Sequence, residues 1–288
     1  MDYAMAPKIP DYRSKVGTTL EEICSFAIDI AEQAGASAKL ARDTSQIEYT
    51  LKAPGQLVTE SDKNNESLII GAIKSRSEND NILAEESANE VNKRLFTDPS
   101  WIIDPIDGTT NYSFYLNHVA VSIAYSEGGT VQVGVVHMPF TGETFSAIKG
   151  KGAFLNGKKI TCPNNVPFSD SLIAFGCPRN VEDAVCFSKV YLEVAKNRLD
   201  IRRMASAASD AVYVSTGRIH CYFESVKPWD IAAGALIAKE AGAIVGHYLP
   251  LPDNLPVPID MYSEGVLIAA PNLYPQYMKM VKDSFGVK

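Results

Sequence analysis

Two aspartates three positions apart close an apolar run in the segment WIIDPIDGTTNY, residues 101–112. Pro105 has no N–H to give to a strand ladder, so we expect the strand to end at Asp104 and Asp107 to lie in the turn beyond it. Both carboxylates and the carbonyl of Ile106 can then face one point. Hard oxygen ligands of this kind are the ones that Mg²⁺ accepts, so the segment predicts a magnesium site.

The residues after these aspartates suit an anion. Gly108 lets the backbone approach a ligand closely, and the N–H groups of Thr109 and Thr110 can point at it from the start of a helix. Metal ligands beside such N–H groups form an arrangement for a phosphate ester. A plain turn without ligands is the other interpretation, because Asp and Gly both favour turns.

Further acids stand at the ends of other expected elements. Glu85 and Glu86 follow the apolar run NILA, Asp62 opens a helix, and Asp230 heads another helix. Alone, each is explained equally well as a helix cap or an exposed turn. If they cluster with Asp104, their like charges make the group costly without cations. The set therefore favours a cation site over separate caps.

Helices and strands that can position these acids are readable in the sequence. Thr19 and Glu22 fit a capping box at the start of a helix over 18–42, and Phe26 and Ile30 fall on its apolar face. Further helices are expected over 61–76, 181–198, 206–217, 229–242 and 272–283, and strands over 81–87, 101–104, 119–126, 131–138 and 144–150. The strands predict a largely antiparallel, meandering sheet in the middle of the chain. Helices layered on sheets are therefore the expected architecture.

Composition bounds the partners and the compartment. The chain has 288 residues, of which 46% are hydrophobic, and a formal net charge of −7, which argues against a nucleic-acid partner. A phosphate ester is still compatible, because bound cations can invert the local charge of a site. The five cysteines form no CxxC pair, so neither a disulfide framework nor a zinc knuckle is indicated, and a reducing, cytoplasmic location is expected. No secretory signal is visible, and no apolar run is long enough to span a membrane.

Five segments together resemble the inositol monophosphatase family of Mg²⁺-dependent, lithium-sensitive phosphatases: LVTESD, ILAEES, WIIDPIDGTTNY, GKGAFLNGKKI and KPWDIAAG. They occur in the order and at roughly the spacing of that family, over about Glu21 to Leu273. The resemblance implies an α/β fold, the layered α-β-α-β-α sandwich of the sugar and inositol phosphatases. It divides the chain into a loose arm (1–17), an N-terminal half with most metal ligands (18–160) and a C-terminal half that completes the substrate site (161–288).

The resemblance also assigns roles to single residues. It implies two or three Mg²⁺ ions per active site, held by Glu85, Asp104, the Ile106 carbonyl, Asp107 and Asp230. Glu85 is counted as catalytic as well, and Glu86 is expected just behind it. Thr109 is implied to lie beside the attacking water, with Asp62 polarising its hydroxyl. The substrate contacts implied are Gly108, Thr109, Thr110, Ser206, Ala207, Glu224 and Lys52.

The implied reaction is hydrolysis of a phosphomonoester by metal-activated water. The sequence agrees in having neither a GxSxG nor a CxxxxxR nucleophile motif, and its four histidines form no ligand pattern. Inositol 1-phosphate is the expected substrate, with histidinol phosphate, fructose 1,6-bisphosphate and nucleotide 3′-phosphates as alternatives. A catalytically silent binding protein on the same fold is the alternative of a different class. Nothing in the sequence favours it, because every matched position keeps the side chain that it needs.

Two departures from the family pattern lie at the pocket rim: the segment 113–118, and the spacing between Glu224 and Asp230, which is one residue shorter than usual. They leave the metal chemistry intact but bear on specificity. The family is commonly dimeric, so a homodimer is expected, with the apolar sheet after Val119 as its interface.

Overall fold

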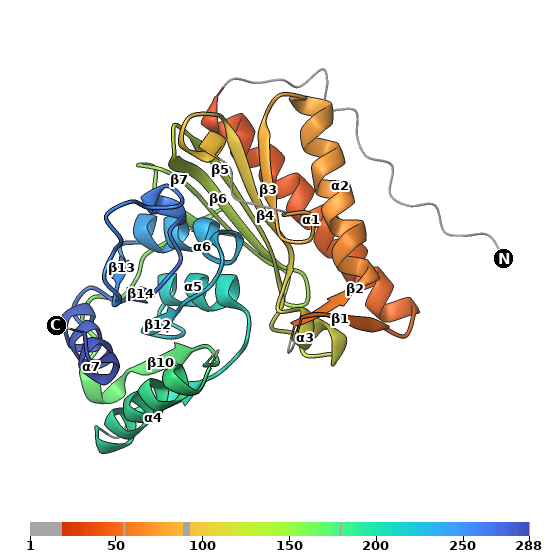
Figure 1. Ribbon diagram of the computed structural model, residues 1–288. Coiled ribbons are helices and arrows are strands. Elements are labelled where there is room, and N and C mark those ends of the chain that lie inside the picture. The colour runs from red at the N-terminus through yellow and green to blue at the C-terminus, as the bar shows by residue number, and fades with distance from the viewer. Residues whose placement is uncertain (1–18, 54–55, 89–92, 179, 198, 288) are drawn as a thin grey trace.

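In the computed structural model, five layers alternate between helices and sheets (Figure 1). The structure describes residues 19–53, 56–88, 93–178, 180–197 and 199–287, so the predicted arm over 1–17 lies outside it. The first layer holds α1 (Leu20–Thr44) and α2 (Glu60–Arg76), and the third holds α5 (Ala207–Ser215) and α6 (Pro228–Glu240). The fifth layer, at the far end from the first, holds α4 (Val181–Lys196) and α7 (Tyr274–Phe285). The predicted α-β-α-β-α sandwich is confirmed.

The second layer is a seven-stranded sheet in the order β3-β4-β5-β6-β7-β8-β9. Only β3 and β4 pair in parallel, and the remaining neighbours are antiparallel, as the predicted meander requires. Its strands are β3 (Asn81–Ala84), β4 (Ser100–Asp107), β5 (Ala120–Glu127), β6 (Thr130–Met138), β7 (Glu143–Ile148), β8 (Ala153–Leu155) and β9 (Lys158–Ile160). A separate hairpin of β1 (Tyr49–Ala53) and β2 (Gln56–Thr59), which the sequence analysis did not predict, precedes α2.

The fourth layer is a mixed five-stranded sheet in the order β11-β10-β12-β14-β13. Its strands are β10 (Leu172–Phe175), β11 (Asp200–Arg202), β12 (Cys221–Glu224), β13 (Ile244–His247) and β14 (Val266–Ala269), and none of them was predicted individually. One hydrophobic core runs from Ile102 in the first sheet through α5 and α6 to Tyr222 in the second. The division at 160/161 therefore stays a prediction, although the strands of the first sheet do end at Ile160.

Helix α1 forms where the sequence placed it. Thr19 accepts a hydrogen bond from the backbone of Glu22, and Glu22 accepts one in return, which completes the predicted capping box. Phe26 and Ile30 are buried against the first sheet, where Phe26 meets Trp101 edge-on with ring centroids 5.7 Å apart.

Strand β4 corrects one expectation. It does not stop at Asp104 but continues through Pro105 to Asp107, where pairing with β5 resumes at Ala120. The register shifts between the two aspartates, so the missing N–H of Pro105 is accommodated by a local irregularity rather than by the end of the strand.

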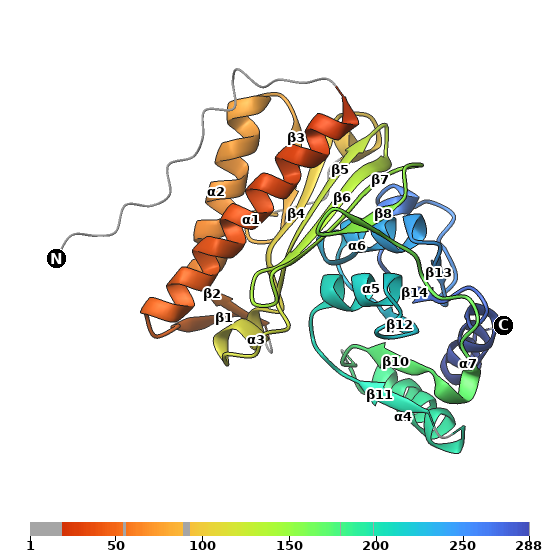
Figure 2. The same ribbon diagram turned by 180° about the vertical axis from the view of Figure 1, so that it is seen from behind.

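The sheet after Val119 also differs from the expectation. All residues of β5 except the last, Glu127, are buried, because α1 and α2 cover one face of the sheet and α5 and α6 the other (Figure 2). The apolar residues of β5 are therefore already covered within one copy of the chain, so this strand offers no exposed apolar surface for the expected interface.

Helix α6 lies unusually close to the sheet. A Cβ placed on Gly134 in β6 would lie 2.7 Å from the carbonyl oxygen of Ala233, so only glycine fits there. This contact sets the distance between α6 and the sheet, and α6 carries Asp230 in its first turn.

Candidate active site

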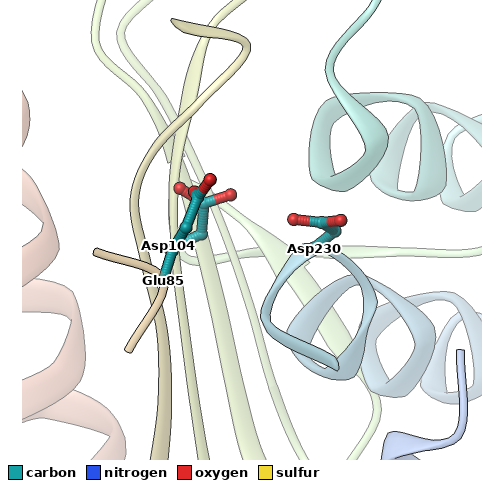
Figure 3. Close-up of side chains that lie close together, drawn as sticks. All are labelled: Glu85, Asp104 and Asp230. Carbon is teal, nitrogen blue, oxygen red and sulfur yellow. The ribbon is translucent and has the colours of Figure 1, made fainter. Parts of the chain in front are cut away.

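Three carboxylates from separate elements meet at one end of the first sheet (Figure 3). Glu85, Asp104 and Asp230 each place an oxygen within 4.8 Å of the others. The register explains the first two: Ala84 pairs with Ile103 in the parallel β3–β4 ladder, so the next residue of each strand is Glu85 and Asp104, side by side. Figure 3 shows Asp230 facing them from the start of α6.

Asp230 serves its helix and the cluster at once. One of its oxygens accepts the backbone N–H of Lys227 at 2.8 Å, which caps α6. Asp230 is the third residue of α6 rather than its N-cap, which is Lys227, and from the first turn of the helix its carboxylate also reaches the cluster.

Burial makes the cluster electrostatically costly. The pKa of Asp104 is raised well above its ordinary value, first by burial and then by the charges of Glu85, Asp107 and Asp230. Burial and the charges of Asp107 and Glu85 do the same to the pKa of Asp230. A divalent cation would remove this repulsion, and an all-oxygen donor set of this spacing fits Mg²⁺. Among the described residues, no other group of three His, Cys, Asp or Glu side chains could hold a metal ion.

Lys52 supplies positive charge at the edge of the cluster. From strand β1, its Nζ lies 2.5 Å from Glu85 Oε1 and 2.7 Å from Glu86 Oε1. The sequence analysis expected Lys52 among the substrate contacts, but the structure brings its ammonium group against these two glutamates. Glu86 also donates its backbone N–H to the carboxylate of Glu66, at 2.8 Å.

Asp107 lies in the same pocket but is held by helix α5. Its carboxylate accepts the hydroxyl of Ser206 at 2.6 Å and the backbone N–H of Ala208 at 2.8 Å. A weaker bond comes from the N–H of Ala207 at 3.3 Å. Burial raises the pKa of Asp107 to about 6 despite these bonds. Ser206 and Ala207, expected as substrate contacts, thus also anchor an expected metal ligand.

Thr109 and Asp62 form the predicted pair. The Thr109 hydroxyl donates to Asp62 Oδ1 at 2.9 Å, and it also lies 3.1 Å from the carbonyl oxygen of Ile106. The other oxygen of Asp62 accepts the N–H of Thr59 at 2.7 Å and its hydroxyl at 2.5 Å, which caps α2. Burial raises the pKa of Asp62 to about 6, against the lowering effect of these hydrogen bonds.

The backbone N–H groups expected to hold an anion, called here the anion cradle (residues 108–110), lie at the start of a short helix. Gly108 has φ +88° and precedes α3 (Thr109–Ser113), a conformation that glycine adopts without strain. Gly108 and Thr109 line the pocket, whereas Thr110 is exposed and is not among the lining residues.

The pocket has a volume of about 230 Å³ and is lined by residues of both halves of the chain. Glu224 forms part of the wall and accepts the hydroxyl of Tyr222 at 2.9 Å. A Cβ on Gly176 would fall 1.8 Å from the carboxylate carbon of Glu224, so this glycine makes room for the glutamate.

Some pocket residues escaped the sequence analysis. Arg203 and Cys177 line the pocket, and Asn111 lies behind it with its amide bound to backbone carbonyls. Asn111 stands inside the DGTTNY motif, so its position was a usable signal. Arg203 and Cys177 carry no motif of their own. The histidines make separate contacts, for example His118 with Asp210 at 2.9 Å, in keeping with the absence of a ligand pattern.

Each helix in the described residues is too short or too polar to cross a lipid bilayer.

Several known proteins are similar in sequence to this chain. The protein named Nus factor SuhB from Pasteurella multocida is 37% identical over 229 residues, which cover 78% of this chain and 85% of that protein. The fructose-1,6-bisphosphatase/inositol-1-monophosphatase of Thermotoga maritima is 39% identical over 194 residues, 67% of this chain and 72% of that protein.

Solved structures show the same fold. The IMPase of Thermotoga maritima superposes with a TM-score of 0.77 at 30% identity, over 91% of this chain and 97% of that chain. The extragenic suppressor protein suhB of Bartonella henselae gives a TM-score of 0.80 at 26% identity, over 90% and 98%. Residues 19–284 match the family described as the inositol monophosphatase family. The chain therefore belongs to the inositol monophosphatase family.

Proposed function

We propose that this protein is a Mg²⁺-dependent phosphomonoesterase that hydrolyses a small polyol phosphate, with inositol 1-phosphate as the first candidate. The observation that carries the proposal is that one pocket is lined by all three clustered carboxylates and by Thr109, whose hydroxyl is bonded to the buried carboxylate of Asp62. Fructose 1,6-bisphosphate is the second candidate, because a relative that is 39% identical is named for both activities.

The metal would be held by the clustered carboxylates Glu85, Asp104 and Asp230, with Asp107 and the carbonyl of Ile106 on the same wall. Bound Mg²⁺ supplies a Lewis acid and lowers the pKa of a coordinated water toward neutrality. The resemblance to the family is the ground for proposing two or three such ions.

Thr109 and Asp62 would prepare the attacking water. In this role the Thr109 hydroxyl would give its single proton to Asp62, the nearer of its two acceptors, and would use a lone pair of its oxygen to accept a proton from water. Asp62 can take the proton that Thr109 passes on, and a pKa of about 6 suits a base that works near neutral pH. The capping bonds from Thr59 fix the orientation of Asp62.

The remaining wall would select the substrate. Glu224 is aimed at the pocket and can accept a hydrogen bond from a polyol hydroxyl, while Gly108 and Thr109 offer N–H groups to the phosphate. Lys52 belongs to this proposal as a cation that can reach the phosphate once a metal neutralises Glu85.

The proposal includes a homodimer, with a different interface from the one first expected. Tyr49 of the hairpin packs against Phe114, with ring centroids 5.7 Å apart, and Leu51, Tyr115 and Leu116 are close to them in the sequence; each of the five is about half exposed or more. Together they present about 500 Å² of apolar surface, which is at the upper end for a monomer and more than half of what one partner of a stable dimer buries.

A cytoplasmic location is also part of the proposal. All five cysteines are free, which suits a reducing compartment.

A substrate panel tests the activity. Inositol 1-phosphate, fructose 1,6-bisphosphate, histidinol phosphate and adenosine 3′,5′-bisphosphate are compared for Mg²⁺-dependent phosphate release, and we expect the first to give the highest kcat/KM.

Asp104→Asn should abolish turnover and weaken Mg²⁺ binding measured by calorimetry, because an amide cannot neutralise a divalent ion. Millimolar Li⁺ at limiting Mg²⁺ should inhibit phosphate release by the wild-type protein. Near-normal turnover by Asp104→Asn would refute the metal assignment.

The relay predicts a specific pattern in a double-mutant cycle. Thr109→Ala should lower kcat about 10²–10⁴-fold, the usual range for general-base assistance, with Mg²⁺ affinity and KM little changed. Asp62→Asn should give a similar loss, and the double variant should be hardly worse, because both residues act in one relay. Multiplicative losses would show independent roles, and a large rise in the Mg²⁺ requirement of Thr109→Ala would place it in the metal site instead.

The metal-free protein should lose stability as pH rises. A buried carboxyl such as Asp62 has a folded-state pKa of about 6, above its unfolded value of about 3.9, so the folded state binds more protons between these values. The free energy of unfolding in EDTA should therefore fall between pH 5 and pH 7.5, by about 1.4 kcal/mol for this group alone. Mg²⁺ should restore stability most strongly at pH 7.5, because it replaces the lost protons.

Urea unfolding at both pH values, with EDTA or Mg²⁺, measures this effect. Asp104→Asn in EDTA is the control, since removal of one repelling carboxylate should flatten the pH dependence. Greater stability of the EDTA-treated protein at pH 7.5 than at pH 5 would contradict the prediction.

The dimer is tested by charge insertion. Leu116→Glu should convert the protein to a monomer at micromolar concentration in sedimentation velocity, because the apolar cluster would then bury a carboxylate. Leu192→Glu is the matched control: Leu192 is similarly exposed but lies on α4, in the outermost helical layer. A wild-type monomer, or equal effects of both variants, would remove the proposed interface.

A further inference from the structure

The lining of the pocket contains a strained turn at Ala205. Ala205 has φ +59°, in the left-handed region, where an alanine is disfavoured about 5- to 30-fold. Arg203, Ala205 and Ser206 all line the pocket, so the strain lies in the wall itself. Strain of this kind persists only where surrounding contacts impose it.

One side chain from the metal motif imposes it. The buried amide Nδ2 of Asn111 lies 2.6 Å from the carbonyl oxygen of Met204 and 2.7 Å from that of His118, with the Ala205 carbonyl at 3.4 Å. An amide nitrogen has two protons to donate, so the two short bonds saturate it. Asn111 thus ties the turn to α3, about ninety residues earlier in the chain.

The turn packs directly on the anion cradle. A Cβ on Gly108 would lie 3.2 Å from the Ala205 carbonyl, 3.0 Å from the His118 carbonyl and 3.2 Å from Cβ of Ser206. Asn111 binds the carbonyl of His118 and that of Met204, the neighbour of Ala205, so it holds both backbone segments that pack on Gly108. The next residues, Ser206 to Ala208, bind the carboxylate of Asp107, so the position of the turn also reaches that side chain.

We propose that Asn111 is a positioning residue for substrate binding, which holds the turn Met204–Ala205 in its left-handed conformation and so fixes the pocket wall formed by Arg203, Ala205 and Ser206. This inference rests on the proposed function, because it assigns the wall to substrate. Without Asn111 the strained alanine returns to ordinary conformations, and only the fraction of molecules with the turn in place binds substrate well. The apparent affinity then falls by that fraction.

The test is a rescue experiment. Asn111→Ala should raise KM for the best substrate of the panel about 5- to 30-fold, with kcat changed less than threefold. Ala205→Gly alone, which adopts a positive φ without strain, provides the reference KM. In the Asn111→Ala background it should bring KM back to within about threefold of Ala205→Gly alone.

If Asn111→Ala instead disrupted the structure of α3, Ala205→Gly would not restore KM, because a glycine at position 205 cannot restore the positions of Thr109 and the anion cradle. An unchanged KM in Asn111→Ala, or a raised KM that Ala205→Gly does not lower, overturns the proposal. Asn111→Ser, which keeps one hydrogen-bond donor, replaces the alanine variant if that variant does not fold. It should raise KM by a smaller factor, and Ala205→Gly should reverse that rise. Asn254→Ala, at an exposed asparagine that does not line the pocket, should leave KM unchanged.

A second readout does not depend on activity. The amides of Ala207 and Ala208 are protected by Asp107, so hydrogen exchange at these positions should accelerate in Asn111→Ala while exchange in α7 stays the same. If the wild type released no phosphate from any substrate, the proposed function would fall, and the exchange result would still decide whether Asn111 holds the turn. Unchanged exchange at both amides overturns the proposal.

Discussion

Mutual repulsion among buried carboxylates is the constraint on which this structure depends. Asp104 is almost fully enclosed, and Glu85 and Asp230 stand within 4.8 Å of it, so their charges cannot all persist without compensation. The fold compensates in part with its own groups. The ammonium group of Lys52 forms an ion pair with Glu85, and the backbone N–H of Lys227 at the start of α6 donates to Asp230. The net charge of the cluster is still negative after this compensation, and this net negative charge is the physical reason for the proposed metal.

The helices do more than cover the sheets, because several of them begin at the pocket. Asp62 and Asp230 cap α2 and α6, while Asp107 receives the first N–H groups of α5. The positive ends of these helix dipoles favour the negative charge that the pocket collects. Asp62 binds its helix with one oxygen and Thr109 with the other, and Asp230 binds its helix with one oxygen, whereas α5 binds both oxygens of Asp107. Local helix stability and site geometry thus depend on the same side chains.

Much of this was readable from the sequence, and the remainder has identifiable causes. The capping box of Thr19 and the meander from β5 to β7 follow local rules, so pattern alone predicted them. The site acids were found because each ends an element, and their grouping followed from the family motifs. The strands of the second sheet are only three or four residues long, too short for periodicity to identify. The continuation of β4 past Pro105 and the anchoring of Asp107 on α5 depend on tertiary pairing, which no local pattern encodes. Asn111 was visible in its motif, but its partners, Met204 and His118, are brought to it only by the fold.

The contact between Gly134 and Ala233 has a consequence for how such a protein tolerates sequence drift. At that point the backbone of α6 lies on the backbone of β6, with no side chain between them whose size could vary. Asp230 stands one helical turn before Ala233, so its distance from Asp104 is set by main-chain contact rather than by core packing. Substitutions elsewhere in the core can then accumulate over generations while the spacing of the two carboxylates is preserved. A change at Gly134 itself would move the helix and the ligand together.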